Sequence, residues 1–236
     1  MSSWTMTRLE QGVVAFVVIF VGLGAYLAFV NEAFFRDNYT VEDGFTEWCT
    51  VVALFVVFVV CARRLWLLRS ERNFGFLAIT GFLTLFALFG AGEEISWGQR
   101  ILGFDSAPFF VENNAQQETG FHNLQITIGD KQYKLNRIVF GLGMAIAFFL
   151  YLAVMTPLHR RVPVATSLID RLGIPMPRNY QIAMYLFVLV VAELMIASSK
   201  RGEIIEFGGS LIFMLNVLYP GNVAIFERGR RTELDR

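Results

Sequence analysis

The sequence predicts an all-α polytopic membrane protein with six transmembrane helices and one extracytoplasmic loop that carries a small β-hairpin. Two observations predict this fold class. Hydrophobic residues make up 55% of the 236 residues and charged residues only 17%, a balance too apolar for a soluble domain of this size. The apolar residues also gather in windows of about 20 residues, which is the length that crosses the hydrocarbon core of a bilayer.

Six such windows follow one another along the chain. They lie near residues 11–30, 45–62, 74–92, 138–158, 180–198 and 204–225. An even number of spans places both termini on the same side of the membrane. We therefore treat residues 1–236 as a single six-span membrane domain, with residues 99–137 as a loop within it.

The distribution of charge predicts how the chain is oriented. If both termini are cytoplasmic, thirteen of the twenty Lys and Arg residues fall in cytoplasmic segments and the other seven fall in segments on the outer side of the membrane. This bias is the positive-inside pattern, and we expect a protein integral to a bacterial inner (plasma) membrane with cytoplasmic termini. Thirteen of the acidic residues fall on the outer side. The net charge of zero therefore conceals an acidic outer face.

The long outer loop, residues 99–137, is the one connection large enough to have structure of its own. Its first half is rich in amides and carboxylates. Its second half places the alternating sequences QITI and KQYKL on either side of Gly129-Asp130, a pattern typical of a β-hairpin.

The first candidate site is the sequence GEEISWGQR, residues 92–100, at the outer end of the third window. If the helix continues, Glu93, Trp97 and Arg100 share one face, while Glu94 points about 100° away. An ionisable group at the edge of the hydrocarbon normally faces the interior of the bundle and has a partner. The alternative is an interfacial pair between Glu and Arg that ends the helix.

The second candidate site lies on the outer loop, where Glu118 and His122 are four residues apart. One helical turn would align this carboxylate and imidazole on one face, an arrangement that suits a metal ion or a general acid/base pair. His122 is the only histidine expected on the outer side. The alternative is a histidine that only makes a hydrogen bond within the loop.

The third candidate site is formed by acids at the outer ends of other spans. Glu203 and Glu206 lie three residues apart where the sixth span begins, and Glu47 begins the second span. Acids at helix N-termini are explained individually by the helix dipole. The depth that they share with Glu93 and Glu94, with His122 above them on the loop, instead favours one cavity, where several carboxylates require protons or a cation.

These patterns predict a carboxylate/His site with a divalent metal ion, since oxygen ligands with one imidazole suit a hard or borderline metal. The predicted catalytic residues are Glu93, Glu94, Glu118 and His122; the predicted substrate-binding residues are Trp97, Gln99, Arg100 and Asn123; the predicted metal ligands are Glu94, His122, Glu47, Glu203 and Glu206. The function that these roles describe is a metal-assisted hydrolase or transferase acting on a lipid or lipid-linked substrate at the outer leaflet.

Two other functions fit the same sequence. The chain could be an accessory or assembly subunit that docks a protein partner through residues 99–137. It could also be an ion- or proton-coupled transporter, for which Glu193, expected near the middle of the fifth span, would be the candidate. Membrane lipid is the expected partner in every case, and nothing in the sequence indicates nucleic-acid binding.

Overall fold

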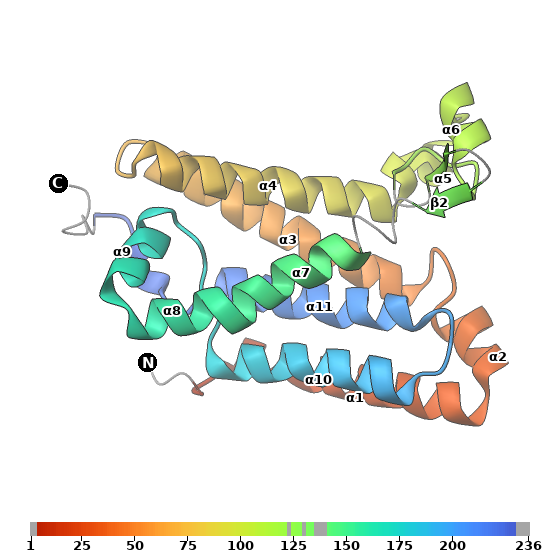
Figure 1. Cartoon of the computed structure of the whole chain (residues 1–236), viewed down its shortest axis with the longest axis horizontal. Coiled ribbons are helices and arrows are strands. Elements are labelled where there is room, and N and C mark those ends of the chain that lie inside the picture. Colours follow the sequence, from red (N-terminus) through yellow and green to blue (C-terminus); the bar gives the residue numbers. More distant parts are fainter. Residues whose placement is uncertain (1–3, 122–123, 129–130, 135–140, 230–236) are drawn as a thin grey trace.

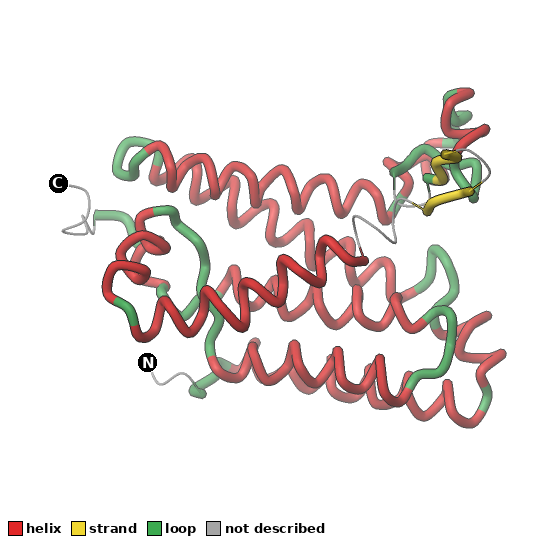
Figure 2. Tube along the Cα trace, in the orientation of Figure 1, coloured by secondary structure: helices red, strands yellow, loops and turns green. Residues whose placement is uncertain are grey.

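The helices of this protein form an elongated bundle in which the long helices run along a common direction (Figure 1). The structure is a computed structural model that describes residues 4–121, 124–128, 131–134 and 141–229. The bundle has two ends, which Figure 2 shows in terms of secondary structure. We call the end that carries residues 95–134 the loop end, and the end that carries α8 and α9 the basic end.

Within the described part of the chain, four helical segments are long and apolar enough to cross a membrane. They are α1 (Arg8–Val30), α3 (Phe45–Leu68), α4 (Phe74–Glu94) and the segment Gly141–Arg161, which comprises α7 (Met144–Phe149), the π-helix η4 (Leu150–Met155) and α8 (Thr156–Arg161). They coincide with the first four predicted windows. Several long apolar helices of this kind are the mark of a membrane-embedded protein.

The last two windows form helices that meet this description less well. Helix α10 (Asn179–Met195) has 17 residues, and α11 (Arg201–Leu218) has charged residues in its first two turns. The predicted extension of the sixth span to residue 225 is wrong, because Pro220 cannot donate the next helical hydrogen bond. Whether α10 and α11 cross the membrane stays a prediction.

Helix α11 is the central element of the bundle and packs on α3, α10 and α1. Its buried side chains include Phe207, Leu211 and Leu215. Helix α3 runs in the same direction as α11, since both begin at the loop end (Figure 1). Ser210 Oγ lies 3.5 Å from Thr50 Oγ1 and fixes the register between the two helices.

A buried ion pair ties three helices together at the basic end. Arg178, at the start of α10, donates to Glu10 of α1 at 2.7 Å, and the Glu10 side chain is completely buried. Tyr180 donates to the same carboxylate, and Gln181 reaches the carbonyl oxygen of Leu215 on α11. The attraction between the two charges and their hydrogen bonds offsets the cost of removing them from water, which would be large for either charge alone.

The loop end holds most of the short elements, namely α2 (Glu32–Phe34), the π-helix η1 (Phe35–Tyr39), the 3-10 turn η2 (Ser96–Gly98), α5 (Gln99–Leu102), α6 (Pro108–Asn113), β1 (Gln125–Ile128) and β2 (Lys131–Lys134). The two strands pair antiparallel, with Gln125 opposite Lys134. The turn predicted at Gly129-Asp130 lies outside the described residues, so the complete hairpin stays a prediction. The basic end adds α9 (Pro163–Arg171) and η5 (Val223–Phe226).

The helix of the third predicted span covers its window but does not continue through residues 95–100. Ser96 and Trp97 both have left-handed backbone conformations, with φ of 46° and 54°, which L-residues other than glycine adopt only at a cost. The helix therefore stops at Glu94, and the chain turns sharply. Glu93, Trp97 and Arg100 do not share one helical face.

Candidate functional site

The polar residues that the sequence singles out fall into two sets at the loop end. One set, which we call the loop anchor, holds the outer loop against the end of α4; it consists of Glu93, Trp97, Gln99, Arg100 and Glu118. The other, which we call the carboxylate cluster, consists of Glu47, Glu94, Glu203 and Glu206. Adjacent residues Glu93 and Glu94 belong to different sets.

Glu93 is buried and uses both carboxylate oxygens. Trp97 Nε1 donates to Oε1 at 2.6 Å, and the backbone N–H of Phe121 donates to Oε2 at 2.5 Å. The indole ring can fold back because Gly92 has no side chain, and a Cβ there would lie 2.9 Å from Trp97 Cε3. Glu93 thus joins the end of α4 to a residue 28 positions later.

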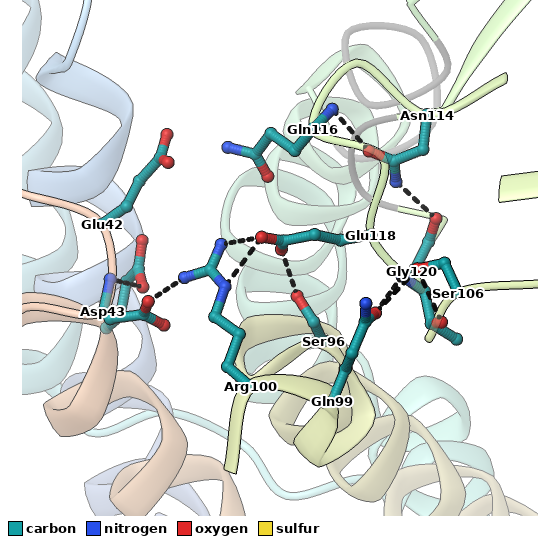
Figure 3. A network of polar contacts seen from close by, with 12 residues as sticks. Glu42, Asp43, Ser96, Gln99, Arg100, Ser106, Asn114, Gln116, Glu118 and Gly120 are labelled. Carbon is teal, nitrogen blue, oxygen red and sulfur yellow. Dashed lines mark hydrogen bonds and ion pairs between the residues drawn. The ribbon is translucent and has the colours of Figure 1, made fainter. Parts of the chain in front are cut away.

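Glu118 makes the second set of contacts in the loop anchor (Figure 3). Ser96 Oγ donates to Oε2 at 2.6 Å, and Arg100 Nε donates to Oε1 at 2.7 Å. The guanidinium of Arg100 also pairs with Asp43, in the connection before α3. Partial burial works to lower the pKa of Arg100, but its hydrogen bonds to Asp43 and Glu118 outweigh this effect and raise it. The arginine therefore stays charged and bridges two acids.

Gln99 completes the loop anchor through its amide oxygen. That oxygen accepts from Ser106 Oγ at 2.9 Å and from the backbone N–H of Thr119 at 2.7 Å. Nearby, Asn114 Nδ2 donates to the carbonyl of Gly120 at 3.0 Å (Figure 3). All five residues of the loop anchor are thus engaged in holding residues 106–121 in place. The structure shows that these five residues position the loop. Their predicted catalytic and substrate-binding roles stay predictions.

The carboxylate cluster brings together side chains from α3, α4 and α11. Glu94 interacts electrostatically with Glu47, Glu203 and Glu206, and Glu206 also interacts with Glu47 and Glu203. The sequence placed these residues at a similar depth, and the structure places them within electrostatic range of one another. Close like charges outside bulk water favour binding of a proton or a cation.

Two members of the cluster have local partners. The backbone N–H of Asp43 donates to Glu47 Oε2 at 2.6 Å. Lys200 lies 3.3 Å from Glu203 and 3.1 Å from Glu42. Burial works to lower the pKa of Lys200, but the neighbouring acids outweigh it and raise that pKa. One lysine shared between two acids leaves the cluster with an excess of negative charge.

The other two members, Glu94 and Glu206, have no hydrogen bond or ion pair with any residue that the structure describes. Glu94 is half-buried at the last position of α4. Glu206 is exposed, although its neighbours Ile204 and Phe207 are completely buried. These two carboxylates are therefore available to a ligand, unlike Glu93.

Thr46 on α3 is a third polar group near the cluster without a partner. Its side chain is 1% exposed, and its Oγ1 makes no hydrogen bond within the described part of the chain. Because α3 and α11 run parallel with Thr50 beside Ser210, the register places Thr46 opposite Glu206, one turn nearer the loop end. A buried hydroxyl without a partner is uncommon in proteins.

The predicted metal ligands lie only partly within the described residues. In the ranges 4–121, 124–128, 131–134 and 141–229, no three His, Cys, Asp or Glu side chains are arranged to hold a metal ion. His122 and Asn123 lie outside the described residues. Metal binding by the predicted ligands therefore stays a prediction.

Glu193 does not lie where the sequence suggested. Helix α10 ends at Met195, so Glu193 is in its last turn rather than near mid-bilayer. Its side chain is 43% exposed and lies 3.3 Å from Arg201 at the start of α11. The prediction of an isolated acid inside the bundle is therefore wrong, because Glu193 forms an ion pair at the surface.

Sequence reasoning missed several contributors to these contacts. Asp43, Lys200 and Thr46 all lie at or near the two sets, but no motif in the sequence indicates their positions. The buried pair of Glu10 and Arg178 gave no local signal, since the two residues are 168 positions apart. Only the left-handed φ of Asp43, 57°, has a sequence correlate, because Asp tolerates this conformation better than most residues.

Comparison with models of known protein families, with curated proteins and with solved structures gave no match for this chain. The fold and the apolar helices define the class, a helical membrane-embedded protein. A fold class of this kind does not by itself indicate a function, which depends on the residues of the site.

Proposed function

We propose that this chain is an integral membrane enzyme that uses the carboxylate cluster for general acid/base catalysis on a lipid or lipid-linked substrate. The reaction would be a hydrolysis or a group transfer. The observation that supports it is the pair Glu94 and Glu206, which come from two helices, interact electrostatically and have no partner among the described residues. In this proposal the loop end is extracytoplasmic, and both termini lie on the cytoplasmic side of a bacterial inner membrane.

The proposed chemistry follows from two carboxyl groups that share a proton. One carboxylate, ionised, accepts a proton from the attacking hydroxyl or water, and the other, protonated, donates one to the leaving group. Lys200 is paired with Glu203, and its positive charge would stabilise the carboxylates of the cluster that remain ionised. The roles of Glu94 and Glu206 as base and acid are interchangeable in this scheme until a substrate is bound.

Access for a lipid is supported by apolar side chains around the loop anchor. Ile101 and Leu102 on α5 are 62% and 75% exposed, and Phe109 on α6 is 57% exposed. Helix α4, which precedes this segment, also has exposed apolar side chains, among them Phe82 and Leu85 near its middle. Exposed apolar side chains on a candidate span and on the short helices that follow it suit the hydrocarbon core and the interface of a bilayer.

The experiment is a lipid turnover assay on purified protein. Wild type, Glu94→Gln, Glu206→Gln and the control Glu112→Gln are reconstituted in vesicles of bacterial polar lipid extract, and lipid species are followed by mass spectrometry. Glu112 is an exposed acid on α6 outside the cluster. A new product should form with wild type and Glu112→Gln and be lost in the two cluster variants. Equal product, or none, from all four proteins contradicts the proposal.

The predicted divalent metal is tested separately. Elemental analysis of the purified wild type, of Glu94→Gln and of His122→Ala would show whether a metal ion copurifies. Stoichiometric metal in wild type that is lost in both variants would support the predicted ligand set. If the metal content is equally low in all three proteins, the predicted metal is not bound and the acid/base scheme operates without a metal ion.

A second function is favoured by the same exposed residues. Since the loop anchor turns its polar groups inward, Leu102 and Phe109 face outward and could contact a protein partner instead of lipid. In this alternative the chain is an accessory or assembly subunit. A stoichiometric protein that copurifies with wild type and is lost in Leu102→Asp with Phe109→Asp would support it over the enzyme. Glu193 is paired with Arg201 at the surface. The transporter function therefore loses its main support, which was an acid in the middle of a span.

A further inference from the structure

The basic end contains a pocket that none of the functions above uses. It lies where α8 meets α9 and has a volume of about 370 Å³. Its lining residues are Arg160, Arg161, Pro163, Thr166, Ser167 and Asp170. Figure 1 shows these helices at the end of the bundle opposite the outer loop. The pocket is thus remote from the carboxylate cluster and of opposite electrostatic character.

Two arginines give the pocket its positive charge. Arg160 donates to the side chain of Asn179 at 2.6 Å and to the carbonyl oxygen of Pro177 at 2.9 Å. Both acceptors are neutral, so these bonds orient the guanidinium without cancelling its charge. Arg161 has no hydrogen bond or ion pair with any described residue. Arginine presents several N–H groups in a planar fork that matches phosphate oxygens.

The polar groups on the other side of the pocket are arranged compatibly. Thr166 Oγ1 already donates to the carbonyl of His159 at 2.5 Å, which leaves Ser167 as the hydroxyl free to donate. The Asp170 carboxylate would repel an anion, but it is paired with His159 Nε2 at 2.9 Å and accepts from Asn222 Nδ2 at 2.7 Å. The charge balance of the lining remains positive.

Apolar side chains beside the pocket indicate the source of such an anion. On α9, Val164 and Leu168 are one turn apart and are 77% and 56% exposed, and Leu158 of α8 is 43% exposed. A short helix with one apolar face and cations next to it is typical of an element that lies in a membrane interface. Basic pockets between the helices of membrane proteins bind the head groups of anionic lipids.

We propose that the pocket between α8 and α9 binds a phosphate ester anion, presented by the head group of an anionic phospholipid. Arg160 and Arg161 would hold the phosphate oxygens, and Ser167 would donate to one of them. The acyl chains would lie against Val164 and Leu168. This binding site is independent of the carboxylate cluster, so it stands or fails separately from the proposed enzymatic function.

The test is retention of lipid by the full-length protein. Wild type, Arg161→Gln and the control Arg63→Gln are placed in nanodiscs of phosphatidylcholine with a minor share of phosphatidylglycerol. Lipids that remain bound after release are then identified by native mass spectrometry. Arg161 and Arg63 are both exposed arginines near the basic end, and neither has a partner among the described residues. Arg161→Gln should therefore fold normally.

Loss of one charge-assisted contact to phosphate weakens binding about tenfold or more. We expect wild type and Arg63→Gln to retain phosphatidylglycerol selectively, and Arg161→Gln to retain it about ten times less. Adding inorganic phosphate distinguishes the sources. Displacement of the lipid only at very high phosphate concentration supports the head group, whereas phosphate binding without lipid selectivity assigns the site to the free anion. Equal retention by Arg161→Gln and wild type, or equal loss in Arg63→Gln, would overturn the proposal.

Discussion

Replacing Glu93 with glutamine should destabilise the protein, whereas the same change at Glu94 should not. The two acids are adjacent in the sequence, but they differ in what their carboxylates contact. Glu93 accepts hydrogen bonds on both oxygens, from Trp97 Nε1 and from the backbone N–H of Phe121. Glu94 accepts none from the described residues and interacts electrostatically with four like charges, those of Glu47, Glu93, Glu203 and Glu206.

The expected size of the effect follows from these contacts. Glutamine at position 93 keeps one acceptor oxygen but turns an NH₂ group toward the second donor. One charge-assisted hydrogen bond is lost at a side chain that is only 8% exposed, which costs about 2 kcal/mol in the free energy of unfolding. Glutamine at position 94 removes a charge from the repulsive cluster. Its free energy of unfolding should stay within about 0.5 kcal/mol of wild type or rise.

The assay is thermal unfolding in detergent micelles, followed by tryptophan fluorescence. A loss of about 2 kcal/mol corresponds to a midpoint lowered by about 4–8 °C for a chain of this size. Limited proteolysis should also cut residues 103–121 faster in Glu93→Gln than in wild type, because this loop loses a contact that fixes it. An unchanged midpoint in Glu93→Gln, or an equally lowered one in Glu94→Gln, would refute the division into loop anchor and carboxylate cluster.

Three further predictions concern the rest of the fold. Arg178→Met should cost about 3–5 kcal/mol because it leaves Glu10 charged and buried, and the double variant with Glu10→Leu should regain most of this loss in the same unfolding assay. Gly173→Ala should lower the midpoint by several degrees, since Gly173 has a φ of 69° and a Cβ would come within 2.6 Å of a phenylalanine ring on α4; an unchanged midpoint would show that the helix can shift. A backbone N–H and an arginine of the C-terminal segment lower the pKa of Glu71 from 4.5, so their contact is stabilising above about pH 4.5 and is lost as the pH falls through the folded pKa. Hydrogen exchange of residues 223–229, corrected for intrinsic rates, should therefore increase in acid for wild type but not differ with pH for Glu71→Gln.

The sequence by itself determined the class of protein and the positions of its apolar helices. Windows of apolar residues fix where a helix can satisfy its backbone within a membrane, and this constraint is local. The predicted windows therefore coincide with α1, α3, α4 and the segment Gly141–Arg161. The grouping of Glu47, Glu94 and Glu206 at one end was also visible, because helix lengths set the depth of each residue.

Only the tertiary structure decided which of these acids are free. Glu93 and Glu94 look alike in the sequence, and the sharp turn at Ser96 and Trp97 separates their environments by bringing the indole back to Glu93. Glu118 resembled half of a catalytic pair, yet its oxygens are taken by Ser96 and Arg100. Hydrogen bonds between residues far apart in the chain depend on the path of the backbone, which composition and spacing do not encode. The acidic patch expected from the sequence is therefore two structures, one that holds the loop and one whose carboxylates remain available.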